Sequence, residues 1–233
     1  PYGFPQVQGQ IQPLCQQAYL VGYDAAAKLP RFVMYELLPQ NALGCVARTN
    51  AFVANQYVQN GPRPDDYTGT GYDKGHAVPD GDLSWDQQVE YESFLMSNMS
   101  PQLPGLNRGI WKLLETATGA WTFSRQHTLI VYAGNIYDVA KDKKIGANQV
   151  VVPDYLWKVV IDKNTNEVLA FLFPQKEALG NDLSQFEVTV ADLEKATGIQ
   201  FKLPANANKT AKPAVWPVDF KAVADAKKAA CKN

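Results

Sequence analysis

The hydrophobic positions near the start of the chain fall into two short runs that are rich in β-branched and aromatic residues. These runs are AYLVGYD and RFVMYELL, and the bend AAAKLP joins them. Two such runs on either side of a bend are typical of paired antiparallel strands. The sequence therefore predicts a β-hairpin over residues 18–38.

Three later apolar runs predict further strands. The run HTLIVYAGNIYD is continuous and ends in a glycine turn, which is typical of a buried central strand. The runs YLWKVVID and EVLAFLFP are separated by KNTN, whose residues favour a turn. They predict a second hairpin.

Helical spacing of apolar residues appears in two segments of the middle of the chain. In SWDQQVEYESFLMSN, Val89, Phe94 and Leu95 can share one face of a helix. In PQLPGLNRGIWKLLETATG, prolines precede a helix that carries Trp111, and Gly119 is the expected end of that helix.

The last part of the chain predicts two short helices and completes the fold class. TVADLEKATGIQF reads as a capped helix that ends at Gly198. Residues 204–233 are rich in Ala, Lys, Asn and Pro, so we expect a surface extension with one helix near 219–230. Strands and helices mix without regular βαβ alternation, which favours an α+β fold. We expect a single domain over residues 1–233, with its core at about 14–203 and a mixed, mainly antiparallel central sheet flanked by helices.

Composition and charge narrow the range of partners. The chain has 233 residues, 46% of them hydrophobic, and no run approaches the roughly 18 apolar residues of a membrane span, so no membrane partner is expected. The formal net charge is −1, so no global basic field attracts nucleic acid. A protein that coats DNA needs many phosphate contacts, and this charge argues against that class. An enzyme that touches only a few phosphates is compatible with it.

The cysteines and the first residue bear on the compartment. Three cysteines, Cys15, Cys45 and Cys231, cannot all pair within one chain. Cys15 and Cys45 lie in segments that could be adjacent strands, so a Cys15–Cys45 disulfide is one hypothesis and three unpaired thiols are the other. The chain begins at Pro1, for which removal of an export signal is one explanation and a trimmed chain another. We expect a secreted or periplasmic protein with a processed N-terminus.

Several common kinds of catalytic site are excluded by the sequence. Two histidines, no H-E-x-x-H and no close cysteine pair leave no thiolate or multi-histidine zinc site. The chain also has no G-x-S-x-G elbow, no P-loop and no G-x-G-x-x-G after a strand. The remaining candidates are polar residues in two segments.

The first segment, GYDKGHAVPDGD, contains one of the two histidines. An unperturbed histidine pKa of about 6.5 suits proton abstraction near neutral pH, and His76 directly follows Asp73, Lys74 and Gly75. The lysine supplies positive charge that stabilises an anionic centre such as a phosphodiester. A structural loop histidine is the alternative at this point.

The second segment pairs Asn107 with Glu115, eight residues later on the expected helix. Asn107 near the helix start either caps it or faces a site. On a regular helix the two residues are roughly 80° apart around the axis and about 12 Å apart along it, too far to chelate one ion directly. Asn107 would then bind the metal while Glu115 holds a water of the ion. A neutral amide as the sole protein ligand suits Mg²⁺, which keeps most of its water; a solvated helix face is the alternative for Glu115.

Together the two segments resemble a known family. DYTGTGYDKGHAVPDGD followed by FLMSNMSPQLPGLNRGIWKLLE is similar to the DNA/RNA non-specific endonucleases, the ββα-metal nucleases marked by an Asp-Arg-Gly-His motif. The similarity extends over about residues 14–203 and includes PRFVMYELL and RTNAF. The resemblance implies a ββα-metal motif and metal-dependent, sugar-non-specific hydrolysis of DNA and RNA, with 5′-phosphate ends as products.

The resemblance also implies roles for single residues. His76 matches the general base, Asn107 the single metal ligand, and Glu115 the residue that orients metal-bound water. Arg48 in RTNAF matches a residue that contacts the phosphate. The cofactor implied is Mg²⁺, with Mn²⁺ able to substitute.

Three further residues belong to the implied substrate site. Lys74 stands where the family motif usually has arginine, so the positive charge is kept but the bidentate fork is lost. With His76, Arg48 and Glu115 it completes the expected catalytic set. Asn98 and Gln102 in SNMSPQ match polar positions that shape the site, and we assign them to substrate binding together with Arg48 and Lys74.

Other functions and partners stay open on the sequence. A catalytically silent protein that binds nucleic acid or a partner is one alternative, although a binding module has no need of the set His76, Asn107 and Glu115. A phosphodiesterase for small phosphoesters is the other, because the same constellation would serve it. The resemblance leaves room for a homodimer and for an inhibitor protein of unknown identity.

Overall fold

The scaffold of the protein is a six-stranded sheet in which every neighbouring pair of strands is antiparallel. The computed structural model describes residues 3–232. The strand order is β11-β10-β7-β4-β3-β2. The bounds are β2 (Gln12–Cys15), β3 (Tyr19–Asp24), β4 (Leu29–Leu37), β7 (Leu129–Ile136), β10 (Tyr155–Asp162) and β11 (Val168–Pro174). The α+β fold class and both predicted hairpins, β3–β4 and β10–β11, are confirmed.

The strand β7 lies inside the sheet, between β4 and β10, as its continuous apolar run predicts. Successive side chains of a strand point to opposite faces. Val131 and Ala133 therefore join one core cluster, whereas Ile130 and Tyr132 join another on the opposite face. Both faces of the sheet need a cover of apolar residues.

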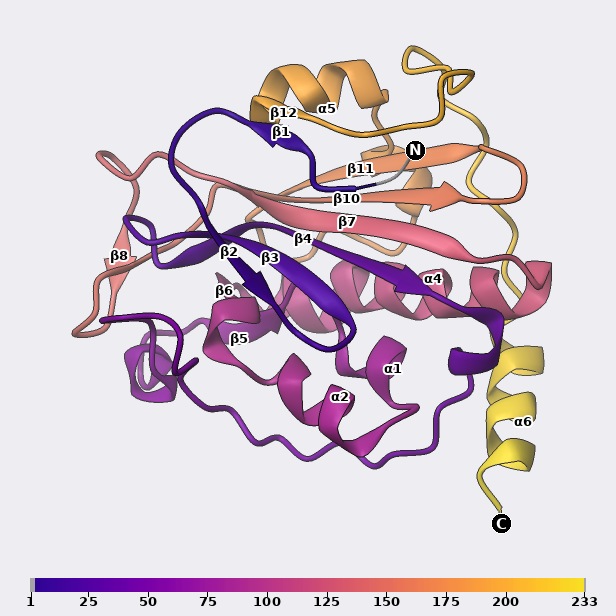
Figure 1. The fold of residues 1–233 in the computed structure, drawn as a ribbon, viewed down its shortest axis with the longest axis horizontal. Helices are drawn as coiled ribbons and strands as arrows, with labels where there is room; N and C mark the ends of the chain where they lie inside the picture. Colours follow the sequence, from indigo (N-terminus) through magenta and orange to yellow (C-terminus); the bar gives the residue numbers. More distant parts are fainter. Residues whose placement is uncertain (1–2, 233) are drawn as a thin grey trace.

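Helices supply this cover on the two faces (Figure 1). On one face lies α4 (Lys112–Arg125), which buries Leu114, Ala117 and Trp121 in the first cluster. On the other lies α5 (Val190–Thr197), which buries Val190 and Leu193 in the second. The helix α5 has the predicted limits, with the Thr189 side chain as its N-cap and Gly198 in the left-handed region at φ 68°.

The predicted end of the long helix at Gly119 is wrong. The helix α4 continues to Arg125 and ends at Gln126, which has a φ of 54°. A glycine inside a helix costs only about 1 kcal/mol relative to alanine. Ala120 and Trp121 beyond it are buried against the sheet, and this packing outweighs that cost.

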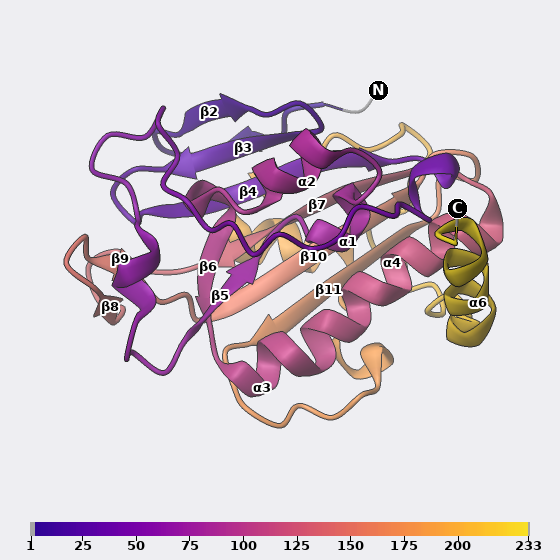
Figure 2. The same cartoon turned by 90° about the horizontal axis from the view of Figure 1, so that it is seen from below.

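Most short elements lie on the side of the sheet that α4 covers and at its edges (Figure 2), whereas the paired strands β1 and β12 lie beside α5 (Figure 1). The helix α2 lies within the segment predicted from the positions of Val89 and Phe94. A third apolar cluster beside the sheet contains β8 and β9. The bounds are β1 (Gln6–Val7), β5 (Asp73–His76), α1 (Asp80–Leu83), α2 (Gln87–Ser93), β6 (Met99–Gln102), α3 (Pro104–Leu106), β8 (Lys144–Ile145), β9 (Val150–Val151) and β12 (Ile199–Gln200). Within residues 3–232, no helix has the length and apolar character needed to cross a membrane.

The C-terminal extension ends in the helix α6 (Phe220–Ala230), close to the predicted limits. This extension is attached to the domain, because Trp216 is buried and its carbonyl oxygen accepts a hydrogen bond from Trp121 Nε1 at 2.9 Å. A disulfide joins Cys45 to Cys231, directly after α6. The hypothesis of a Cys15–Cys45 bridge is therefore wrong. Cys15 ends the edge strand β2 as an exposed free thiol, whereas Cys45 lies after β4 in a segment that is not a strand.

The disulfide should contribute strongly to stability, because it closes a loop with a sequence separation of 186 residues. We expect Cys231→Ser to lower the free energy of unfolding by about 2–4 kcal/mol. Urea unfolding of wild type and variant, without reductant, measures this difference. Cys15→Ser is the matched control and should leave the midpoint unchanged; equal midpoints for all three proteins would contradict the expectation.

Candidate active site

The centre of the candidate site is a pair of short strands followed by a helix. The strand β5 pairs with β6 in antiparallel register, with Asp73 opposite Gln102 and His76 opposite Met99. A Cβ atom at Gly75 would lie 2.1 Å from Cδ of Gln102, so only glycine allows this close packing. The chain then passes through α3 into α4, which completes a ββα unit.

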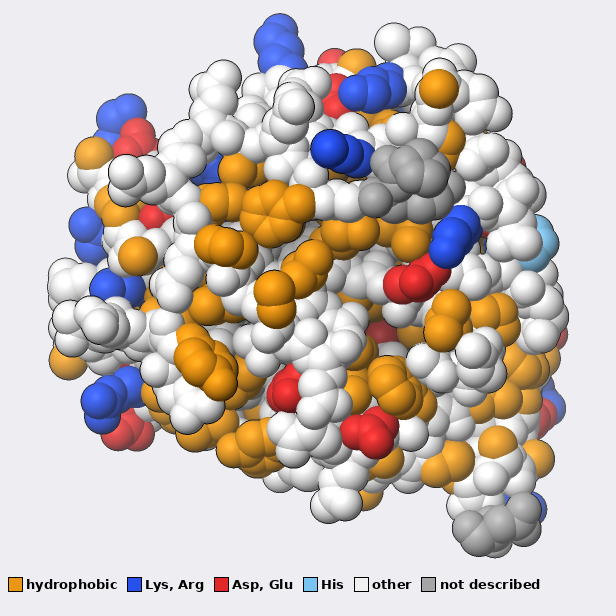
Figure 3. All heavy atoms as spheres, viewed as in Figure 1, with side chains coloured by type: hydrophobic (Ala, Val, Ile, Leu, Met, Phe, Trp, Pro, Cys, Tyr) orange, Lys and Arg blue, Asp and Glu red, His pale blue; other side chains and the backbone are white. Residues whose placement is uncertain are grey.

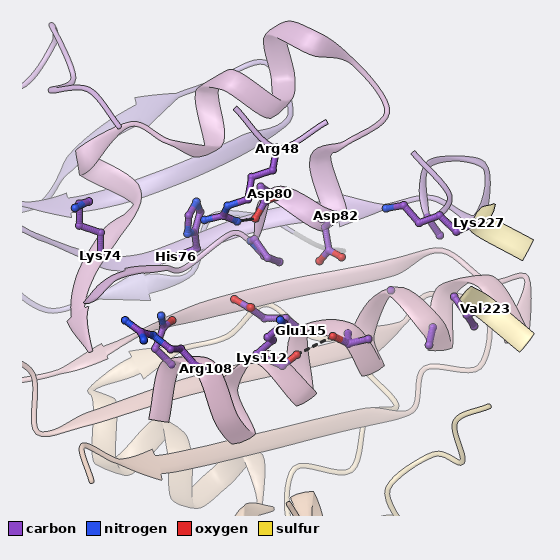
Figure 4. Close-up of a pocket in the computed structure, with 17 residues that line it drawn as sticks. Arg48, Lys74, His76, Asp80, Asp82, Arg108, Lys112, Glu115, Val223 and Lys227 are labelled. Carbon is purple, nitrogen blue, oxygen red and sulfur yellow. Dashed lines mark hydrogen bonds and ion pairs between the residues drawn. The ribbon is translucent and has the colours of Figure 1, made fainter. Parts of the chain in front are cut away.

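Five of the predicted residues line one cavity of about 650 Å³ between this unit and the neighbouring helices (Figure 4). Asp80, Asp82, Arg108, Lys112 and Lys227 are among the other residues that line it. The five predicted residues are Arg48, Lys74, His76, Asn107 and Glu115.

His76 lies in an apolar wall of this cavity. Its ring packs edge-on against Phe94, with centroids 5.0 Å apart, and Phe52 lies at 5.8 Å. The residue is 6% exposed, and its Nε2 has no hydrogen-bond partner among the described residues. Burial, with a further contribution from Arg48, lowers the pKa of His76 to about 3. The imidazole is therefore neutral at physiological pH, which is the form that accepts a proton, although the low pKa makes it a weaker base than an exposed histidine.

Asp73 fixes the orientation of the Asn107 amide. Asn107 Nδ2 donates to Asp73 Oδ2 at 2.9 Å, and Arg108 donates to both Asp73 oxygens at 2.8 and 2.7 Å. Burial alone would raise the pKa of Asp73, but the hydrogen bonds from Arg108 and Asn107 hold it below its usual range. An ionised carboxylate only accepts hydrogen bonds, so the amide nitrogen faces Asp73. The amide oxygen of Asn107 is the atom left to bind a ligand.

The helix start differs from the regular geometry used to relate Asn107 to Glu115. Residues Asn107–Trp111 form a π-helical turn, and Gly109 has non-helical angles of φ −99° and ψ −115°. The expected separation of about 80° and 12 Å assumed an undistorted helix, and it does not apply across this turn. Both side chains nevertheless line the same cavity. Turns of this kind are frequent at functional sites.

The two cations predicted to hold phosphate are each placed against an aromatic ring. Arg48 forms an ion pair with Asp80, donates from Nε to Asn50 at 2.8 Å and lies 4.9 Å above the Phe94 ring. Lys74 Nζ lies 4.9 Å from the ring centroid of Phe52. Cation–π contacts of this kind hold a charge in place without neutralising it.

The predicted Glu115 belongs to a group of buried charges whose other members, Asp82 and Lys158, sequence reasoning missed. Lys158 is fully buried, and its Nζ lies 4.8 Å from the Trp111 ring centroid. Burial raises the pKa of Glu115 to about 7 and that of Asp82 to about 6, while Lys158 acts in the opposite direction on both. Asp82 also accepts a hydrogen bond of 2.7 Å from the Tyr35 hydroxyl. The signal was a single lysine within the apolar run YLWKVVID.

Asn98 and Gln102 do not line the cavity. The Asn98 amide bonds the backbone N and O of Val78 at 3.0 and 2.9 Å and the carbonyl oxygen of Ser93 at 2.8 Å. It thus holds the segment that follows His76. Gln102 is fully buried against Gly75. Substrate binding by these two residues stays a prediction, and the geometry gives Asn98 a positioning role.

A neutral histidine and an oriented amide oxygen on a ββα unit define the class of ββα nucleases. Residues 2–208 match the family described as DNA/RNA non-specific endonuclease, and the chain belongs to this family. The chain is 28% identical over 226 residues to human "Nuclease EXOG, mitochondrial", covering 86% of this chain but only 59% of that protein. It is 28% identical over 218 residues to human "Endonuclease G, mitochondrial", with 86% and 71% covered. A crystal structure of an EndoG/EndoGI complex superposes with a TM-score of 0.73 at 25% identity, covering 86% of this chain and 88% of that chain.

The expectation of a secreted or periplasmic protein is contradicted by these relatives. Both human proteins are mitochondrial nucleases. The expectation rested on the chain beginning at Pro1. Removal of a signal and trimming of the chain explain that start equally well, so it does not indicate a compartment.

Burial of a neutral His76 should make stability depend on pH. The folded-state pKa of about 3 lies below the ordinary 6.5, so the unfolded chain binds the proton more readily. The free energy of unfolding should therefore fall as the pH drops from 6.5 toward 3, by up to about 1.4 kcal/mol per pH unit from this residue. Urea unfolding at several pH values should show a shallower fall for His76→Asn than for wild type. Other groups contribute equally to both proteins, so identical pH dependence would contradict the assignment.

Proposed function

We propose that this protein is a metal-dependent endonuclease that hydrolyses phosphodiester bonds in DNA and RNA, with His76 as general base and Mg²⁺ held by Asn107. The observation that carries the proposal is the neutral His76 in one cavity with the Asn107 amide that Asp73 orients. Membership of the non-specific endonuclease family supports the same reaction. The chain spans only 59% of the length of human EXOG. The activity and substrates proposed for this chain therefore rest on its own site.

The residues of the cavity fit a hydrated divalent cation. The Asn107 amide oxygen is a hard donor of the kind Mg²⁺ prefers. Glu115 Oε1 is buried and has no hydrogen-bond partner among the described residues, so water on a cation would satisfy it. No group of three or more His, Cys, Asp or Glu within residues 3–232 could hold a metal ion. Mn²⁺ accepts the same oxygen donors and should substitute.

Attack on phosphorus then follows from the positions of the side chains. His76 accepts the proton of the attacking water at a ring nitrogen of its neutral imidazole. Arg48 and Lys74 bind oxygens of the phosphate and offset the charge that grows on them. Mg²⁺, when bound, supplies further positive charge to the phosphate and to the leaving 3′ oxygen. The bond from water oxygen to phosphorus forms as the bond to the 3′ oxygen breaks, which leaves 5′-phosphate ends.

The positive charge proposed to bind phosphate is confined to the cavity, at Arg48 and Lys74. The formal net charge is −1, and on the face seen in Figure 3 the lysines and arginines are scattered singly. A protein without a broad basic surface binds backbone phosphates through a few contacts in its cavity. Contacts to the backbone carry little base information, which suits cleavage of many sequences.

Cleavage of supercoiled plasmid and of RNA tests the proposal directly. Wild type should degrade both with Mg²⁺ or Mn²⁺ and neither with EDTA. His76→Ala and Asn107→Ala should each lose about 10²–10⁴-fold in rate, because one removes the base and the other the metal ligand. His127→Ala is the matched control, since His127 lies outside the cavity and bonds Asp162 at 2.8 Å.

The outcomes separate the alternatives. No cleavage by folded wild type with any metal would leave a nucleic-acid-binding protein on a nuclease scaffold. Hydrolysis of a small phosphodiester that long DNA does not inhibit would indicate a phosphodiesterase for small substrates.

The raised pKa of Glu115 should make metal binding depend on pH. Burial raises this pKa to about 7 in the protein without a metal, and a cation favours the ionised form. Affinity for Mg²⁺ should therefore rise between about pH 6 and pH 8. Calorimetric titration with Mg²⁺ measures it. Glu115→Gln should remove most of this dependence, while Lys158→Met should move the rise to higher pH. An unchanged pH profile in Glu115→Gln would exclude Glu115 from the metal site.

A further inference from the structure

One wall of the candidate active-site cavity comes from the C-terminal helix α6. Val223 and Lys227 of this helix line the cavity together with His76 and Glu115. Figure 4 shows Lys227 at the opposite end of the cavity from Lys74, with Asp82 between them. The match to the endonuclease family ends at residue 208, so this wall lies beyond the part of the chain that the family describes.

The disulfide fixes the end of α6, while the buried Trp216 holds the segment before its start. None of the residues of α6 is buried, so packing alone holds the helix weakly. The Cys45–Cys231 bond fixes its C-terminal end to the segment that reaches Arg48 three residues later. One covalent bond therefore relates Lys227 on one side of the cavity to Arg48 on another.

The charge of Lys227 is available to a ligand. Its Nζ donates a long hydrogen bond of 3.4 Å to Ser84 Oγ. Within residues 3–232 it forms no ion pair with a carboxylate. A lysine is a compact point charge on a flexible stem, which suits a phosphate whose position varies. A neighbouring lysine, Lys228, is exposed and does not line the cavity.

A polynucleotide bound for cleavage brings more than one phosphate to the cavity. Successive phosphates of a strand follow the scissile one at short, regular intervals. If the scissile phosphate lies near His76 and Lys74, the neighbouring phosphates of the strand lie either further along the cavity or outside it. Asp82 and Glu115 repel a phosphate once they are ionised, and Asp80 is already paired with Arg48. Lys227, which has no ion pair among the described residues, attracts a phosphate at its own end of the cavity.

We propose that Lys227, held in place by the Cys45–Cys231 disulfide, binds a backbone phosphate outside the scissile bond and so favours polynucleotides over small phosphoesters. This inference rests on the proposed nuclease function. The competing role for Lys227 is structural: its charge partly offsets that of Asp82, as its effect on the pKa of that carboxyl shows. A structural role would not distinguish long substrates from short ones.

Steady-state kinetics of Lys227→Ala and of the matched control Lys228→Ala test the inference. The substrates are linear duplex DNA at several salt concentrations and bis(p-nitrophenyl) phosphate. Lys227→Ala should raise KM for DNA about 3–10-fold and reduce the slope of log KM against log salt by about 1, with kcat unchanged. Hydrolysis of the small ester should not change, and Lys228→Ala should match wild type throughout.

A second arm tests the disulfide. Cys231→Ser should raise KM for DNA as Lys227→Ala does, and the double variant should show no further increase, because both changes remove one contact. Cys15→Ser is the control. Circular dichroism and urea unfolding establish that each variant is folded before its kinetics are compared.

The outcomes are distinct. If wild type cuts neither substrate, the proposed function fails. If wild type is active and Lys227→Ala equals Lys228→Ala in KM and salt slope, the phosphate site is overturned while the nuclease stands. If Lys227→Ala loses DNA and small-ester hydrolysis equally, Lys227 has the structural role. If Lys227→Ala raises KM for DNA but Cys231→Ser has the KM of wild type, the disulfide is not needed to place Lys227.

Discussion

The Asp73 carboxylate connects the two chemical halves of the candidate active site. It stands on the same short strand as His76, and it accepts hydrogen bonds from the Asn107 amide and the Arg108 guanidinium. The strand pairs with β6, and Gly75 packs directly on the Gln102 side chain. Asp73 therefore links the positions of His76 and the Asn107 amide, which are 31 positions apart in the chain. An amide free to rotate would offer nitrogen as often as oxygen, and nitrogen does not bind a cation.

Burial shifts the pKa of three groups that line the cavity. It keeps His76 neutral and raises the pKa of Glu115 and Asp82 toward neutrality. Lys158 beneath them limits this rise and makes the group tolerable in the interior, because isolated buried charges are far more costly than compensated ones. A cation that enters the cavity would meet carboxyl groups close to ionisation and a histidine without positive charge.

Much of the scaffold was predictable because its signals are local. Apolar runs and turn residues located β3, β4, β7, β10 and β11, and the caps located α5. The motif residues His76, Asn107 and Glu115 were found through their spacing and resemblance, and the structure places them in one cavity. The end of α4 was missed because packing of Trp121 against the sheet overrides the preference of Gly119.

Other features had no local signal. Disulfide connectivity does not follow from the positions of three cysteines, and here Cys45 pairs with the one farthest away in sequence. The role of Asp73 could have been inferred from its place in the motif, and that of Lys158 from its charge in an apolar strand. The non-helical angles at Gly109 had no signal in the apolar spacing, so the regular helix geometry from Asn107 to Glu115 was the wrong guide.

The C-terminal helix shows how a segment outside a family's common part can change a site without changing its chemistry. The groups that would act on phosphorus all lie before residue 116, within the family match. The helix α6 adds one wall, one lysine and a covalent bond to the segment that carries Arg48. Its exposed surface contributes little to the core, so its contribution is to the shape and charge of the cavity. Changes in such a segment would alter which substrates enter the cavity and how they are oriented in it. They would leave His76 on β5 and Asn107 before α4 in place.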